Sequence, residues 1–271
     1  LDKGHELRVD DPEAVLNSIT DDTAVVMLTQ VDYRTGRMHD MAAITAAAHA
    51  QGAMVIWDLA HSAGAVPGHL EDCAADFAVG CTYKYLNGGP GAPAFIYVRS
   101  DHAERAQPAL AGWLGHEAPF AFDLDYRPGV GIERFRVGTP SVLQMAALQA
   151  SMEIWAQADV ETLRQQSIAL SQHFIERVEA DCPDLTLASP RSPSQRGSQV
   201  SFAFEHGYAV MQALIAKGVV GDFRAPNLIR FGFAPLYNTM ADVDLAVDTL
   251  GDIMKAGSWD KPEFHARQKV T

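Results

Sequence analysis

The segment "VIWDLAHSAGAV", residues 55–66, decides the fold because it ends an apolar run with an aspartate. A short apolar run of this kind is typical of a buried strand, and Asp58 is its last residue. A second segment, "CTYKYLNGGPGAPAFIYV" over residues 81–98, carries Lys84 in a turn that opens into glycines. Together the two segments predict a sheet with a carboxylate and an amine near one edge.

Runs of strand length alternate with helical patterns around these segments. "TAVVMLT", residues 23–29, predicts a buried strand, and "DMAAITAAAHAQG", residues 40–52, predicts a helix capped by Asp40. Further strands are predicted over residues 53–58, 75–80 and 93–98. This order indicates a right-handed βαβ unit and an α/β fold with a mainly parallel sheet covered by helices. Ligands bind beyond the carboxyl ends of such strands, where Thr29 and Asp58 lie.

The second half of the chain has a different pattern. Residues 141–157 and 160–180 repeat apolar residues at three- and four-residue spacing, which predicts a long helical stretch leading out of the first domain. After a Pro- and Ser-rich break come short strands and helices, typical of a small α+β domain. We therefore expect a large domain over residues 1–160 and a small C-terminal domain over residues 161–271.

The amino-acid composition disfavours some classes of binding partner. The 271 residues include 21 Lys and Arg against 34 Asp and Glu, and the net charge of −13 disfavours nucleic acid and anionic membranes. Cys73, Cys81 and Cys182 form neither a disulfide framework nor a paired metal-ligand pattern, which favours a reducing cytoplasm and no metal site. The sequence has no apolar run long enough to cross a bilayer and no basic-then-apolar signal segment at its start.

From its residue type alone, Lys84 could have three roles. It could be a solvated surface residue, a phosphate binder or a Schiff-base nucleophile. Asp58 favours the third, because a pyridoxal phosphate site needs a lysine for its Schiff base and an acid opposite the pyridine nitrogen. The glycines at 88, 89 and 91 allow backbone turns that side chains would obstruct.

The motifs "WDLAHSAGAVP" and "GCTYKYLNGGPGAPAF" together resemble those of the kynureninase family, fold-type I pyridoxal-phosphate enzymes of tryptophan catabolism. The resemblance continues through "GWLGH", "GTPS" and "RFGFAPLYN" and covers essentially the whole chain. It implies that Lys84 forms the Schiff base, that Asp58 pairs with the pyridine nitrogen and that His61 lies beside the cofactor. It also implies that Tyr83 binds the phosphate and serves as general acid or base, and that Thr29 contacts the cofactor. For His61 and Thr29 an ordinary structural role stays open.

The resemblance assigns four further positions. Trp113 and Thr139 match residues that reach the phosphate from a neighbouring subunit, which implies a homodimer with shared sites. Arg230 matches the residue that binds the substrate α-carboxylate, a task suited to its bidentate fork; a salt-bridged strand residue is the alternative. Gly138 with Thr139 favours kynurenine over its 3-hydroxy form.

The implied reaction is hydrolysis of the Cβ–Cγ bond of L-kynurenine to anthranilate and L-alanine. Two alternatives remain open, a desulfurase or lyase of the same fold type and a kynureninase-like piece without activity. The sequence begins in polar residues without an initiator methionine, whereas the family carries a segment before the strand at 23–29 that completes the phosphate site. We therefore expect an incomplete first sheet with exposed apolar edges and weakened cofactor binding.

Overall fold

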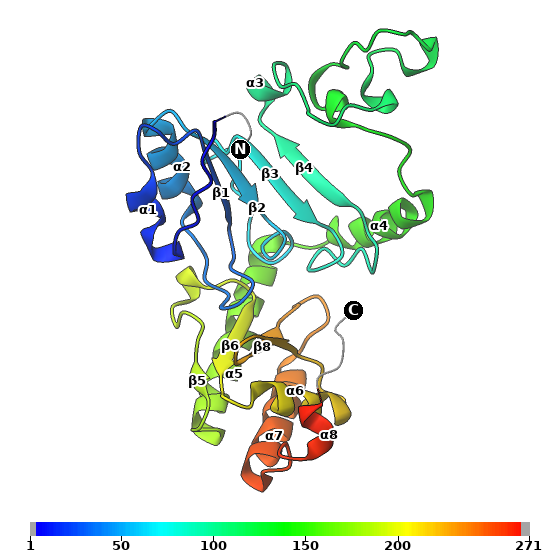
Figure 1. Ribbon diagram of the computed structural model, residues 1–271. Helices are drawn as coiled ribbons and strands as arrows, with labels where there is room; N and C mark the ends of the chain where they lie inside the picture. The colour runs from blue at the N-terminus through cyan, green and yellow to red at the C-terminus, as the bar shows by residue number, and fades with distance from the viewer. Residues whose placement is uncertain (1–3, 267–271) are drawn as a thin grey trace.

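The structure, a computed structural model, describes residues 4–266 and contains two four-stranded sheets (Figure 1). The first sheet consists of β1 Val25–Thr29, β2 Met54–Asp58, β3 Phe77–Cys81 and β4 Ala94–Val98. The second consists of β5 Thr186–Leu187, β6 Gln199–Ala203, β7 Asp222–Arg224 and β8 Leu228–Gly232. In the sequence, all strands of the first sheet precede residue 160 and all strands of the second sheet follow it. The domain boundary expected at residue 160 stays a prediction.

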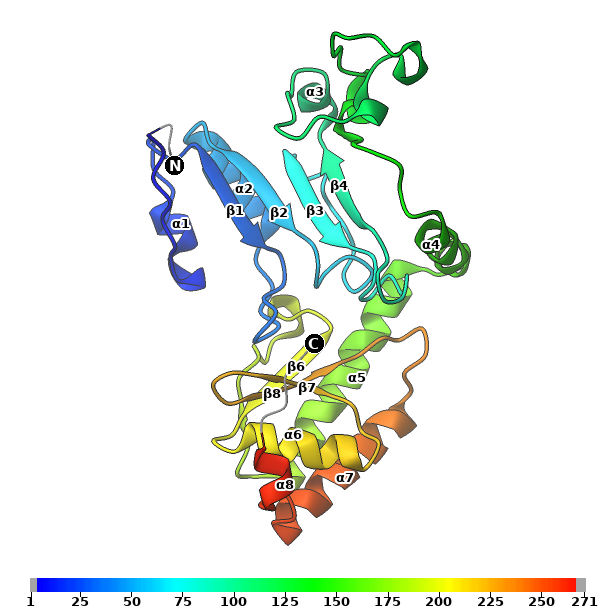
Figure 2. The ribbon, with the colours of Figure 1, turned by 45° about the vertical axis from the view of Figure 1, so that its right-hand side comes forward.

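The first sheet has the order β1-β2-β3-β4 and is mainly parallel, as predicted. β1 pairs with β2 and β2 with β3 in parallel, while β4 is antiparallel to β3 because the turn over residues 82–93 returns the chain directly. In this register Thr29 lies opposite Asp58. The carboxyl ends of β1, β2 and β3 therefore meet at one edge, which faces the second sheet in Figures 1 and 2.

Helices cover both sheets. They are α1 Val15–Ser18, α2 Met41–Ala50, α3 Ser100–Ala103, α4 Val142–Trp155, α5 Val160–Asp181, α6 Gly207–Ala216, α7 Met240–Ala256 and α8 Pro262–His265. Asp40 caps α2 as predicted, accepting the Ala43 N–H at 2.9 Å. The long helical stretch is divided into α4 and α5 because Asp159 caps a new helix, accepting the Thr162 N–H at 3.1 Å.

Each sheet has its own apolar core. α2 packs on β2 in the first, where the fully buried Trp57 donates its indole N–H to Thr45 Oγ1 at 3.1 Å. The second sheet, in the order β5-β6-β8-β7, is antiparallel and packs against α5, α6 and α7. Phe174 of α5 lies at its centre, with its ring centroid 4.8 Å from that of Phe231.

A buried carboxylate ties the amino-terminal ends of the first sheet together. Asp76 is 2% exposed and precedes β3. It accepts hydrogen bonds from the Val55 N–H at 2.8 Å, from His49 Nε2 of α2 at 2.8 Å and from His102 Nε2 of α3 at 2.7 Å, and it pairs with Arg99 at 2.8 Å. Burial alone would raise the pKa of Asp76, but the hydrogen bonds from His49, Val55 and His102 outweigh burial and lower it.

The loop over residues 30–38 joins the two sheets through its backbone. Five consecutive carbonyl oxygens, from residue 32 to residue 36, accept hydrogen bonds from the second half of the chain. Their donors are Gln199 Nε2, Arg230 Nη1, Ser201 Oγ, Ser189 Oγ and the Gly197 N–H, in that order. At Gly36, whose φ is +72°, an added Cβ would lie 2.7 Å from the Gln199 carbonyl oxygen, so a side chain would separate the two parts.

Apolar side chains are exposed along β1, an outer strand of the first sheet, as expected from the sequence. Met27 is 66% exposed and Val25 is also exposed. Between residues 4 and 266, no helix combines the length and the hydrophobicity that a membrane crossing requires.

Candidate active site

Two predicted site residues end adjacent parallel strands. Asp58 closes β2, and its Oδ1 accepts the Ala60 N–H at 2.8 Å, which holds the carboxylate at the strand end. Thr29 closes β1 beside it and donates its hydroxyl hydrogen to the Val31 carbonyl at 2.8 Å. The edge of the sheet therefore presents a carboxylate and a hydroxyl side by side.

Lys84 reaches this edge from the turn that follows β3. Its Nζ lies 3.2 Å from Nε2 of His61, which belongs to the turn after β2. Burial, and then the positive charges of Lys84 and Arg230, lower the pKa of His61 to about 4. His61 is therefore a neutral imidazole near pH 7, whose ring nitrogen can share a hydrogen bond with the lysine amine.

Glycines shape the lysine turn. The Gly88 N–H donates to the Thr82 carbonyl at 2.8 Å, and an added Cβ on Gly88 would lie 2.9 Å from the same oxygen. Gly89 and Gly91 have φ values of +81° and +78°, which L-residues rarely adopt. Glycine is therefore favoured at Gly88 because the backbone approaches closely there, and at Gly89 and Gly91 because φ is positive.

Tyr83 precedes the lysine and is 51% exposed. Its ring centroid lies 5.5 Å from Lys84 Nζ. The neighbouring Cys81 thiol raises the pKa of Tyr83 most, through charge and a hydrogen bond, with smaller contributions from burial and Asp58. The phenol therefore keeps its proton at neutral pH.

Arg230 faces the same edge from β8 of the second sheet. Its side chain is 12% exposed, and its two terminal nitrogens donate to the Tyr33 carbonyl and to the Asp222 carboxylate. Its charge contributes to the lowered pKa of His61, which places it within electrostatic range of that histidine. The chain therefore brings a cation opposite the Lys84 turn.

No hydrogen bond, ion pair or ring contact joins Lys84 to Trp113, Gly138 or Thr139 in the part of the chain that the structure describes. These three positions belong to the segment over residues 104–141, which in Figures 1 and 2 extends beyond α3 and then runs back to α4. Trp113 is 47% exposed, and its ring packs edge-on against Phe120 with centroids 5.7 Å apart.

Sequence reasoning missed three residues that surround Arg230. The Tyr33 ring lies 6.4 Å from the His61 ring, and the Arg224 guanidinium carbon lies 5.8 Å from the centroid of Tyr33. Asp222 pairs with both arginines. The "DFR" pattern at 222–224 was the available signal, because residues two apart on a strand share a face.

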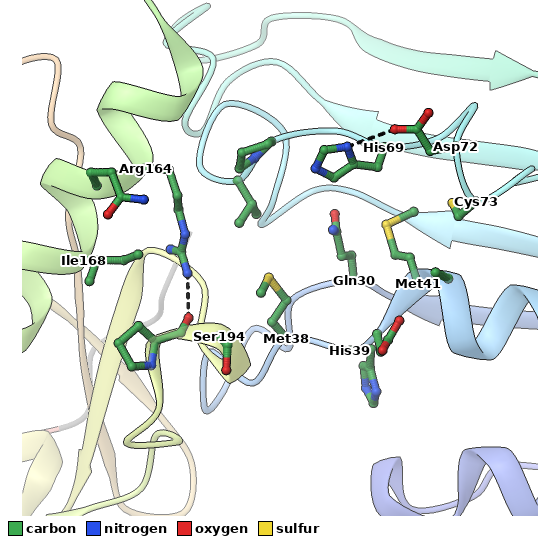
Figure 3. Close-up of a pocket in the computed structure, with 16 residues that line it drawn as sticks. Gln30, Met38, His39, Met41, His69, Asp72, Cys73, Arg164, Ile168 and Ser194 are labelled. Carbon is green, nitrogen blue, oxygen red and sulfur yellow. Dashed lines mark hydrogen bonds and ion pairs between the residues drawn. The ribbon is translucent and has the colours of Figure 1, made fainter.

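A separate cavity of about 640 Å³ opens beside the loop over residues 30–38 (Figure 3). Met38, Met41 and Ile168 line it together with Arg164, which donates to the Pro193 carbonyl at 2.7 Å. None of the predicted site residues lines this cavity. Of the residues that line the cavity, His69 and Asp72 form a titratable pair at 3.3 Å, and this pair is exposed. We assign the chemistry to the Lys84 edge because a half-buried lysine–histidine contact lies there beside a carboxylate at the strand ends.

Replacing Lys84 with methionine is expected to raise the pKa of His61 above about 4, because the repulsion that disfavours the imidazolium is removed. Burial and Arg230 remain, so the pKa should stay below the ordinary 6.5. An NMR titration of the His61 ring protons measures this. Lys217→Met, at the end of α6, is the matched control and should leave the titration unchanged; an equal pKa in Lys84→Met would contradict the contact.

Comparisons with known proteins agree on one family. A model of the kynureninase C-terminal domain matches residues 163–250, and one of the DegT/DnrJ/EryC1/StrS aminotransferase family matches residues 6–79. A kynureninase of Burkholderia mallei (strain SAVP1) is 50% identical over 100% of this chain, and one of Pseudomonas fluorescens is 49% identical. The chain spans 66% of the length of either relative.

Solved structures support the fold. A cysteine desulfurase from Thermococcus onnurineus NA1 matches with a TM-score of 0.78 at 20% identity, covering 90% of this chain and 63% of that one. The cysteine desulfurase CsdA from Escherichia coli matches with a TM-score of 0.76 at 24% identity, covering 90% and 62%. Likeness at this identity shows the fold alone, and it confirms the predicted fold type I.

Proposed function

Because the chain belongs to the kynureninase family, we propose that it carries the chemistry for hydrolysing the Cβ–Cγ bond of L-kynurenine to anthranilate and L-alanine. The observation that carries the proposal is the 3.2 Å contact between Lys84 Nζ and a neutral His61 beside Asp58, at the carboxyl edge of a parallel sheet. For this reaction the site must also provide a group that accepts negative charge from the substrate α-carbon, a residue that binds the substrate carboxylate, and a proton donor.

The residues at this edge fit pyridoxal 5'-phosphate. Lys84 offers an amine for the aldehyde, and Asp58 offers a carboxylate for the pyridine nitrogen. Thr29 and His61 flank these two groups as further cofactor contacts. When bound, this cofactor supplies a sink for the negative charge that develops at the substrate α-carbon.

The remaining steps belong to this chain's own side chains. The Lys84 amine is the group placed to take the proton from the α-carbon, and neutral His61 at 3.2 Å can orient that amine through a hydrogen bond. Tyr83, which keeps its phenolic proton, can donate it to the carbonyl oxygen at the γ-carbon as water adds there. Arg230 binds the α-carboxylate and so fixes which substrate atoms face the lysine.

We place Trp113, Gly138 and Thr139 at the site of a second copy of the chain. The exposed Trp113, Phe120 and Phe122 rings in the segment over residues 104–141 support a homodimer in which each copy completes the other's phosphate and aryl sites. Gly138 with Thr139 favours kynurenine over its 3-hydroxy form as the substrate, on the resemblance to the family alone. Free Cys73, Cys81 and Cys182 support a cytoplasmic location.

The experiment is a visible absorption spectrum of the chain with added pyridoxal phosphate, followed by L-kynurenine and fluorescence detection of anthranilate. A borohydride-reducible band with anthranilate release is the expected result. Sulfide release from cysteine without anthranilate would favour a desulfurase instead. A flat spectrum would contradict the proposal that this chain alone holds the cofactor.

A further inference from the structure

One carboxylate holds two arginines next to the Lys84 edge. Asp222 Oδ2 accepts a hydrogen bond from Arg230 Nη2 and forms an ion pair with Arg224 Nη2 at 2.7 Å. All three residues lie on the antiparallel pair β7 and β8, where Asp222 is the register partner of Arg230. The geometry fixes the Arg230 guanidinium, because its second terminal nitrogen is held by the Tyr33 carbonyl.

The charge of this group is not balanced. Asp222 alone would neutralise Arg230, and a carboxylate ligand would then meet an ion pair instead of a cation. Arg224 pairs with the same oxygen, so the three side chains together keep one positive charge. Arg230 thus gains a rigid support without losing its attraction for an anion.

Arg224 is placed for an electrostatic role. Its guanidinium lies over the Tyr33 ring, which in turn lies against His61, and its charge contributes to the lowered pKa of that histidine. Its Nε is buried and has no hydrogen-bond partner in the part of the chain that the structure describes. Arg224 therefore lies at the edge of the site. Arg230 is the residue proposed to bind the substrate carboxylate.

We propose that Arg224 is a positioning residue for carboxylate binding: it compensates the charge of Asp222, so that Asp222 can orient Arg230 while Arg230 stays available to the substrate's α-carboxylate. The inference rests on the proposed function, in which Arg230 binds that carboxylate. It predicts that the charge of Arg224 matters only for ligands that carry a carboxylate, and that its shape matters little.

The test is calorimetric titration of the full chain, with pyridoxal phosphate present, using L-kynurenine and the corresponding amine that lacks the α-carboxylate. Arg224→Gln is expected to weaken L-kynurenine binding about tenfold and to leave binding of the amine unchanged. Arg224→Lys, which keeps the charge, should bind both ligands within about twofold of the unaltered chain. Retained amine binding shows that each variant is folded.

The outcomes distinguish a failure of the role proposed for Arg224 from a failure of the carboxylate site proposed at Arg230. If Arg230→Gln weakens L-kynurenine binding and Arg224→Gln does not, the role of Arg224 is wrong while that of Arg230 stands. If Arg230→Gln leaves binding unchanged, or the unaltered chain does not bind L-kynurenine, the proposed carboxylate site itself is wrong. Equal loss for both ligands in Arg224→Gln and Arg224→Lys would identify a purely structural residue and overturn the proposal.

Discussion

Lys84→Ala is expected to abolish the borohydride-reducible absorbance of the chain with pyridoxal phosphate and to lower anthranilate formation by at least about a thousandfold. The methyl side chain has no amine to join the aldehyde, and it leaves His61 without its contact at 3.2 Å. Absorption spectra before and after borohydride, with mass spectrometry of the reduced chain, measure the first effect; anthranilate fluorescence measures the second.

Lys217→Ala is the control for this change, since Lys217 lies at the end of α6, on the second sheet's side of the molecule. It should keep both the absorbance and the product. A reducible adduct at another lysine in Lys84→Ala would show that the assigned amine is wrong. Loss of anthranilate with an unchanged adduct would likewise remove Lys84 from the covalent role.

Asp76→Asn is expected to lower the free energy of unfolding by about 3 kcal/mol, because it breaks a buried charge cluster and leaves partners without their carboxylate. Asp76 is 2% exposed and holds His49, His102 and Arg99 together. Urea denaturation followed by tryptophan fluorescence measures the change. Asp72→Asn, whose carboxylate is exposed and contacts His69 at 3.3 Å, is the control and should cost little.

The same residue sets a pH dependence with a definite sign. The pKa of Asp76 is lowered in the folded chain from its ordinary 3.8, so the unfolded chain takes up the proton at higher pH. The stabilisation is complete above pH values near 3.8 and is lost as the pH falls through the folded pKa. Asp76→Asn should therefore flatten the acid limb of stability against pH. An equally steep limb in the variant would contradict this.

Local signals predicted what depends on local chemistry. Asp40 was predictable as a helix cap because side chains of its type accept N–H groups at that position. Asp58 was predictable at the sheet edge because the apolar run before it has the length of a strand, and parallel strands align their carboxyl ends. Lys84 followed from its glycine-rich turn, and the kynureninase motifs then named the cofactor.

Other parts of the site depend on contacts between distant segments. Arg224 meets Tyr33 across about 190 positions of sequence, and no short pattern indicates such a meeting. The division between α4 and α5 was missed because apolar spacing continues through it, and only the cap at Asp159 marks the break. Whether Trp113 serves a neighbouring copy depends on an assembly that one chain's spacing does not encode.

The run of backbone acceptors over residues 32–36 has a consequence for sequence variation. Carbonyl oxygens are the same in every residue type, so the side chains of Arg34 and Thr35 can be exchanged without removing a single bond of the seam. The donors Gln199, Ser201 and Ser189 use side-chain atoms and have no such freedom. Saturation mutagenesis should therefore find Arg34 permissive and the three side-chain donors strict. Gly36, whose added Cβ would meet Gln199, and Thr35, whose hydroxyl donates to Asp32 Oδ1 at 2.7 Å, should tolerate fewer residue types than Arg34.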